Sequence, residues 1–65
     1  MGSYLRAQDA VKTQPDYPAG HFALAEAARR LKKNDEAAAE YKAYLKLEPD
    51  GDDAKSAEKA LAELK

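Results

Sequence analysis

The sequence predicts an all-α fold of about four helices that pack as antiparallel hairpins. Alanine occurs 15 times and leucine 7 times, whereas valine and threonine occur once each and isoleucine is absent. Alanine and leucine are strong helix formers, and the β-branched residues are the ones that favour strands. Breaks at Pro15-Asp16-Tyr17-Pro18, Lys33-Asn34-Asp35 and Pro49-Asp50-Gly51-Asp52 divide the chain into four segments of helical periodicity.

The chain has 65 residues, near the lower limit for folding alone, and we expect one domain over residues 4–65. Without cysteine, it has neither disulfides nor a cysteine-based zinc site. Eleven Lys and Arg against twelve Asp and Glu give no reason to expect a nucleic-acid or membrane partner. No apolar run is long enough to span a bilayer. Residues 1–3 lack an export segment and look like a vector-derived remnant, so the compartment stays open, with the cytoplasm as the default.

The first two helices are expected over residues 4–14 and 18–32. Packing side chains recur every three or four residues on one face of each: Tyr4, Ala7, Ala10 and Val11 in the first, and His21, Leu24, Ala25, Ala28 and Leu31 in the second. Pro15 ends the first helix, because the residue before a proline is disfavoured in the α region. Asp16 is the expected N-cap of the second helix, and Asn34 is the expected left-handed residue that ends it.

The third and fourth helices are expected over residues 35–47 and 53–64. Their packing stripes are Ala37, Ala38, Tyr41, Tyr44, Leu45 and Leu47 in the third, and Ala54, Ala57, Leu61 and Leu64 in the fourth. Asp35 is the expected N-cap of the third helix, and Asp52 or Asp53 that of the fourth. Because only two or three residues join the second helix to the third, these two helices must pack as an antiparallel hairpin.

The sequence also repeats itself with a period of 34 residues. Pro15-Asp16 recurs as Pro49-Asp50, and the helices before these prolines match in register: Ala7 with Tyr41, Ala10 with Tyr44, Val11 with Leu45, and Lys12 with Lys46. Helix–turn–helix units of this period are typical of the tetratricopeptide repeat. The fourth helix follows another register, since Leu61 lies 37 residues after Leu24, and the loop before it is therefore about three residues longer.

Residues 18–51 resemble one full tetratricopeptide repeat. The positions that match the family's pattern are Leu24-Ala25 at its Leu-Gly, Ala28 at a usual aromatic, Ala37 at its early small residue, Tyr41 at the aromatic one turn on, and Leu45 and Pro49 at its end. The resemblance implies that residues 4–14 are the second helix of a preceding repeat and that residues 53–65 are a capping helix. Together these would form a short α-solenoid of stacked antiparallel hairpins.

Some residues depart from the family's pattern. Lys32 and Asn34 replace the usual turn glycine and the aromatic that follows it, and Tyr44 replaces a second signature alanine. A tyrosine there would either separate the hairpin or point at the next helix. We expect the second outcome, because Ala54 and Ala57 leave room for the ring.

No catalytic or metal-binding constellation is visible, so we expect no enzymatic activity, no metal and no cofactor. His21 is the single histidine and has no evident nucleophile or orienting carboxylate, which indicates a packing role. The acidic segment around Asp50 fails as a calcium loop. An EF-hand loop needs glycine at its sixth position and glutamate at its twelfth, where this chain has Lys55 and Leu61.

The resemblance assigns a ligand groove to the concave face, which the first helix of each repeat lines. The matching positions here are Ala19, Phe22, Glu26, Arg29, Arg30 and Lys33, with Asp50 and Gly51 at the rim. Phe22 lies off the packing stripe and is the only large apolar side chain of the set, so it is a candidate anchor for a peptide. The alternative is that the first helix or a second copy covers it. The basic residues at the end of this helix are expected first to compensate the helix dipole, and they also suit an acidic ligand.

We therefore expect a non-catalytic protein–protein interaction module of tetratricopeptide type that binds a peptide or a partner protein. The alternative is a structural repeat fragment, natural or engineered, whose main property is homo-oligomerisation, with a homodimer as the simplest form. One and a half repeats plus a cap fall short of the about three repeats that such arrays need for stability. Tyr4, Leu5 and Val11 would then be partly exposed on the first helix.

Overall fold

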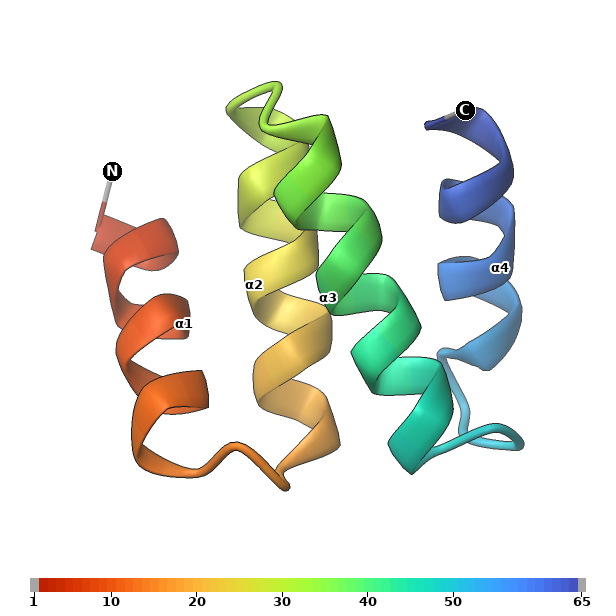
Figure 1. Ribbon diagram of the computed structural model, residues 1–65, viewed down its shortest axis with the longest axis horizontal. Helices are drawn as coiled ribbons and strands as arrows, with labels where there is room; N and C mark the ends of the chain where they lie inside the picture. Colours follow the sequence, from red (N-terminus) through yellow and green to blue (C-terminus); the bar gives the residue numbers. More distant parts are fainter. Residues whose placement is uncertain (1, 65) are drawn as a thin grey trace.

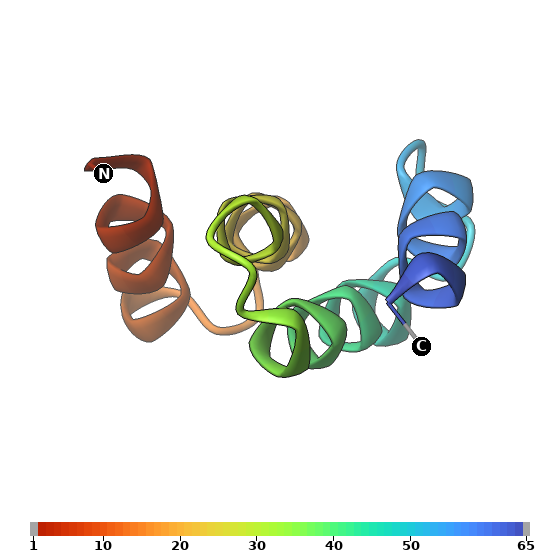
Figure 2. The same ribbon diagram turned by 90° about the horizontal axis from the view of Figure 1, so that it is seen from above.

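The computed structural model describes residues 2–64, which form four α-helices and no strand: α1 (Gly2–Thr13), α2 (Pro18–Arg30), α3 (Asn34–Leu47) and α4 (Ala54–Glu63). Each helix packs antiparallel against the next one in the chain (Figure 1). Seen from above, α3 lies below α2 and α4, so the helices form an open curved layer (Figure 2). The expected all-α fold of antiparallel hairpins is confirmed. Gly2 and Ser3, from the expected remnant, lie in the first turn of α1, and Met1 and Lys65 lie outside the described residues.

The end of α2 differs from the expectation. Lys32, not Asn34, is the left-handed residue, with φ of 61°. The N–H of Lys33 returns to the carbonyl of Ala28 at 2.9 Å and that of Lys32 to Arg29 at 3.0 Å, which is a Schellman turn. This turn fixes the left-handed position two residues after Arg30. Asn34 is consequently free to begin α3.

The expected N-caps are also partly wrong. Tyr17, not Asp16, is the N-cap of α2, because Pro18 occupies the first helical position and forces the residue before it to be extended. Lys33 is the N-cap of α3, so Asp35 lies inside the first turn, where a negative charge favours the helix dipole. Asp53 is the N-cap of α4, as one of the two expected alternatives, but its side chain makes no capping hydrogen bond.

The core consists mainly of alanine packed around tyrosine. Tyr41 is fully buried and is the largest such side chain, and its neighbours in the core include Ala25, Ala28, Ala37 and Ala57. Small residues let the helices approach closely, and the ring then fills the space that alanines leave. This matches the expected stripes of α2 and α3 at their centres.

The burial predicted for the packing stripes is wrong at the helix ends. Leu31 and Leu47 are exposed, and each stands at the C-terminal end of its helix. In α4 the buried positions are Ala54, Ala57 and Ala60, whereas Leu61 and Leu64 are only half-buried. The buried face of α4 is thus rotated towards Ala60.

Tyr44 points at the next helix, as expected. Its side chain is buried, and its hydroxyl accepts a hydrogen bond from the Asp53 N–H at 3.2 Å, directly before α4. Gly51 passes over the same hydroxyl so closely that a Cβ added there would lie 2.5 Å from the Tyr44 oxygen. The α3–α4 loop therefore requires glycine at position 51, because a side chain would displace a buried ring.

His21 joins three segments of the chain. Its Nδ1 lies 2.6 Å from Glu40 Oε1 on α3, and its Nε2 lies 2.5 Å from the carbonyl oxygen of Pro15, between α1 and α2. Carboxylate and carbonyl oxygens only accept, so both ring nitrogens carry a proton when both bonds form. Burial lowers the pKa of His21, but the bonds to Glu40 and Pro15 and the charges of Glu40 and Asp16 outweigh this and raise it. His21 is buried, as expected for a packing residue, but the expectation that it has no carboxylate partner is wrong, because Glu40 on the neighbouring helix supplies one.

Candidate functional site

Three of the expected site residues meet in a recess between α2 and α4. Phe22, Glu26 and Arg29 are spaced four and three residues apart, so they share one face of α2. The recess has a volume of about 470 Å³, and the residues that line it are Phe22, Glu26, Arg29, Asp53, Ser56, Lys59, Ala60 and Glu63. We call it the α2–α4 recess.

Phe22 is half-buried and packs on the two core tyrosines of α3. Its ring centroid lies 5.9 Å from that of Tyr41 in an edge-to-face arrangement and 5.3 Å from that of Tyr44 at a tilt of 57°. Aromatic pairs at such distances are mutually stabilising. Phe22 is therefore held from behind by α3, and its remaining surface faces the α2–α4 recess.

Charged groups of the α2–α4 recess are largely paired. Arg29 Nη2 donates to Glu63 Oε1 at 2.7 Å, and this pair joins α2 to α4. The Tyr41 hydroxyl donates to Glu26 Oε2 at 2.5 Å. Burial, followed by the bond to Glu26, raises the pKa of the Tyr41 phenol, which stays neutral. Counting Lys59, two cations face three carboxylates (Glu26, Asp53, Glu63), so the recess has no excess positive charge with which to select an acidic ligand.

The other expected site residues lie elsewhere. Ala19 is exposed and lines a neighbouring recess with Gly51, which was expected at the rim. Arg30 is exposed at the end of α2 and lines neither recess. Lys33 lies at the N-cap of α3, and its Nζ stands 5.7 Å from the ring centroid of Tyr4 on α1. The six residues thus do not form one continuous surface.

Sequence reasoning missed the contribution of α4 to the recess. Ser56, Lys59 and Glu63 follow one another at three and four residues and share a helix face. That spacing is visible in the sequence, but α4 was expected to serve only as a cap. Which helix this face opposes depends on the curvature of the helical layer, and no local pattern reports that curvature.

His21 is the single imidazole of the chain, and its hydrogen bonds are internal. Both nitrogens of His21 are occupied by oxygen partners. Within residues 2–64 no three His, Cys, Asp or Glu side chains converge in a way that could hold a metal ion. Over the same range, no helix is both long enough and apolar enough to cross a membrane.

Comparison with known proteins gives no match, whether with protein-family models, with curated proteins or with solved structures. The resemblance to the tetratricopeptide repeat therefore stays a prediction that depends on the 34-residue period and the matched residues. What the structure adds is an all-helical chain whose consecutive helices pack against one another.

Proposed function

We propose that this chain is a non-catalytic interaction module of tetratricopeptide type that binds a peptide segment of a partner protein in the α2–α4 recess. The observation that carries the proposal is the position of Phe22. It lies outside the packing stripe of α2, yet Tyr41 and Tyr44 hold its ring at the floor of a recess with charged walls. A rigid aromatic surface ringed by polar groups is the usual form of a binding hot spot.

The charges of the α2–α4 recess favour a ligand with charges of both signs. Arg29 and Lys59 supply cations, and Glu26, Asp53 and Glu63 supply carboxylates. Such a mixed wall complements a peptide with one apolar side chain flanked by charges of both signs better than a uniformly acidic one. The small area of the recess limits the affinity to about micromolar or weaker.

Selection from a random peptide library on the immobilised chain tests the proposal. Fluorescence anisotropy of a selected, labelled peptide then gives its Kd for the wild type and for variants. Lys59→Glu reverses a charge inside the recess and is expected to change the Kd about fivefold, the range of an exposed ion pair. Lys55→Glu makes the same change on α4 outside the recess and is expected to leave the Kd unchanged.

Phe22→Leu tests the aromatic floor while keeping an apolar side chain there. We expect the Kd of the selected peptide to rise about tenfold, because a branched aliphatic side chain offers no flat surface for stacking. Thermal melts confirm that the variant is folded at the assay temperature. Equal binding by the wild type, Phe22→Leu and Lys59→Glu would overturn the proposal.

A further inference from the structure

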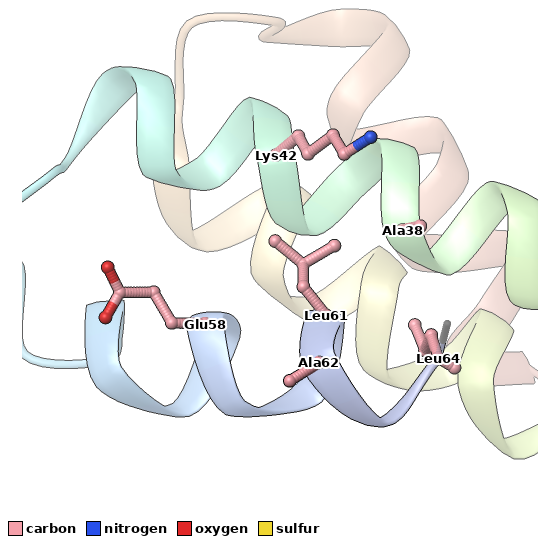
Figure 3. Close-up of a pocket in the computed structure, with 6 residues that line it drawn as sticks. All are labelled: Ala38, Lys42, Glu58, Leu61, Ala62 and Leu64. Carbon is pink, nitrogen blue, oxygen red and sulfur yellow. The ribbon is translucent and has the colours of Figure 1, made fainter.

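A second concave surface lies between α3 and α4, on residues that the α2–α4 recess does not use. Figure 3 shows Leu61 of α4 reaching towards α3, where Lys42 lies above it, with Glu58 to its left on α4. The surface has a volume of about 380 Å³, and its lining residues are Ala38, Lys42, Glu58, Leu61, Ala62 and Leu64. We call it the α3–α4 groove. Leu61 and Leu64 remain half-buried, and Ala62 is exposed.

The internal repeat shows what this groove corresponds to. A step of 34 residues relates α1 to α3, and a step of 37 relates α2 to α4. At the second step Leu24 corresponds to Leu61, and Gly20, which sits against Val11 and Ala10 of α1, corresponds to the fully buried Ala57. The buried Ala60 corresponds to Ala23, which is exposed. The α3–α4 groove then corresponds to a groove between α1 and α2 that is lined by Tyr4, Gln8, His21, Leu24, Ala25 and Ala27.

That equivalent groove, the α1–α2 groove, is covered by α3. Leu24 and Ala25 are buried there, with 3% and 0% of their surface exposed. Two hydrogen bonds tie α3 to it: the Tyr4 hydroxyl donates to Glu36 at 2.6 Å, and His21 lies 2.6 Å from Glu40. The helix that would complete the α3–α4 groove must therefore resemble α3.

The segment of this chain that matches α3 is α1, and its charges fit the α3–α4 groove. In the α1–α2 groove, Glu40 of α3 pairs with His21 of α2. Residue 6, the equivalent of Glu40, is Arg6, and residue 58, the equivalent of His21, is Glu58. The acidic residue of the first pair is replaced by a basic one, and the basic residue by an acidic one. An acid–base pair is therefore possible at both places. Arg6 and Glu58 are both exposed in the single chain.

We propose that α1 of a second copy of this chain occupies the α3–α4 groove, with Arg6 of the second copy paired to Glu58. The α1–α2 hairpin of the second copy then follows α3–α4 in the same way as α3–α4 follows α1–α2 within one chain. This contact is head to tail and does not close on itself, so copies add in a row as concentration rises.

The contact between copies is weak because the side chains of α1 are smaller than the equivalent side chains of α3. Its residues Ala7 and Ala10 stand at the positions of Tyr41 and Tyr44, which fill the core beneath α3. Less apolar area is removed from water, and the association is correspondingly less favourable than the packing within one chain.

Sedimentation velocity of the full chain, from about 10 µM to about 2 mM, tests the proposal because this range covers weak association. The mean mass of the wild type is expected to rise steadily with concentration. Arg6→Glu and Glu58→Arg should each weaken association about tenfold, because each places like charges together. Lys12→Glu makes a matched reversal on α1 away from the pair and should have no effect.

Mixing the two reversed variants supplies the decisive result. In an equimolar mixture, every junction between an Arg6→Glu chain and a Glu58→Arg chain again pairs opposite charges. Association should therefore recover towards the wild-type level, although each chain finds a matching partner in only half of the molecules. Both changes are at exposed positions, and circular dichroism verifies that both variants are folded. A wild type that is monomeric throughout would overturn the proposal and leave the groove to a different protein. A closed dimer indifferent to both reversals, or a mixture without rescue, would also overturn it.

Discussion

The α1–α2 groove and the α3–α4 groove are built from equivalent positions but end in different states. In the α1–α2 groove, Leu24 and Ala25 are buried, Ala25 packs in the core cluster with residues of α3, and hydrogen bonds to Tyr4 and His21 fix α3 there. In the α3–α4 groove, the equivalents Leu61 and Ala62 are half-buried and exposed. Within residues 2–64, a groove between two helices is therefore closed where a further helix packs on it, and the α3–α4 groove has no such helix.

Truncating Tyr41, on the helix that covers the α1–α2 groove, is expected to lower the free energy of unfolding most. Tyr41 is fully buried, contacts Phe22 and donates a hydrogen bond to Glu26. Tyr41→Ala should lower the free energy of unfolding by about 3–5 kcal/mol, enough to unfold so small a chain. Urea denaturation followed by circular dichroism measures this. Tyr17→Ala, at a position with 53% of the residue exposed, is the control and should change stability little.

The packing of α4 on α3 can be perturbed through the loop that joins them. Gly51→Ala should destabilise the chain by about 1–3 kcal/mol, since the new Cβ would lie 2.5 Å from the buried Tyr44 hydroxyl. Gly20→Ala is the matched control with the opposite sign. Its Cβ would meet only ordinary contacts at 3.6 Å, and alanine in a helix gains about 0.5–1 kcal/mol over glycine. Thermal melts of both variants should move in opposite directions, and equal shifts would contradict the loop geometry.

The turn that places α3 over the α1–α2 groove can be improved. Lys32 adopts φ of 61°, which costs a non-glycine residue about 1 kcal/mol. Lys32→Gly should therefore raise the free energy of unfolding by about that amount, whereas Asn34→Gly, inside α3, should lower it. Chemical denaturation of the two variants decides the matter. Stabilisation by Asn34→Gly instead of Lys32→Gly would contradict the left-handed conformation of Lys32 and place it at residue 34.

The smallest expected effect concerns the bond between His21 and Glu40. Because the pKa of His21 is raised on folding, its contribution to stability is full below its ordinary pKa of about 6.5 and is lost as the pH rises through the raised value. The stability difference between the wild type and His21→Gln should therefore shrink above that pH. Titration of the His21 ring protons by NMR gives the pKa directly. A value below 6.5 would contradict the assigned hydrogen bonds.

The sequence was sufficient for the fold class and the helix centres, because alanine-rich stripes with a three-to-four-residue spacing determine which faces meet. It also predicted the direction of Tyr44 from the small residues opposite. It was insufficient at the helix ends, where Lys32 took the left-handed position expected for Asn34. There, the two backbone bonds of the Schellman turn, rather than residue preference, selected the position.

The candidate site was predicted less well than the fold. Phe22, Glu26 and Arg29 share a helix face, as their spacing required, but Lys33 turned out to lie beside Tyr4. Residue spacing determines neighbours on one helix only. The partnership of Arg29 with Glu63 on α4 depends on how far the layer curves, and that is determined by packing between all four helices.

The most direct test of the difference between the two grooves is to record the leucine methyl resonances of the wild type by NMR while its concentration is raised. If α1 of a second copy enters the α3–α4 groove, the methyl signals of Leu61 and Leu64 should shift with concentration, while those of Leu24, already buried in the single chain, should stay in place. Unchanged Leu61 and Leu64 signals in a sample whose mean mass rises would contradict the account.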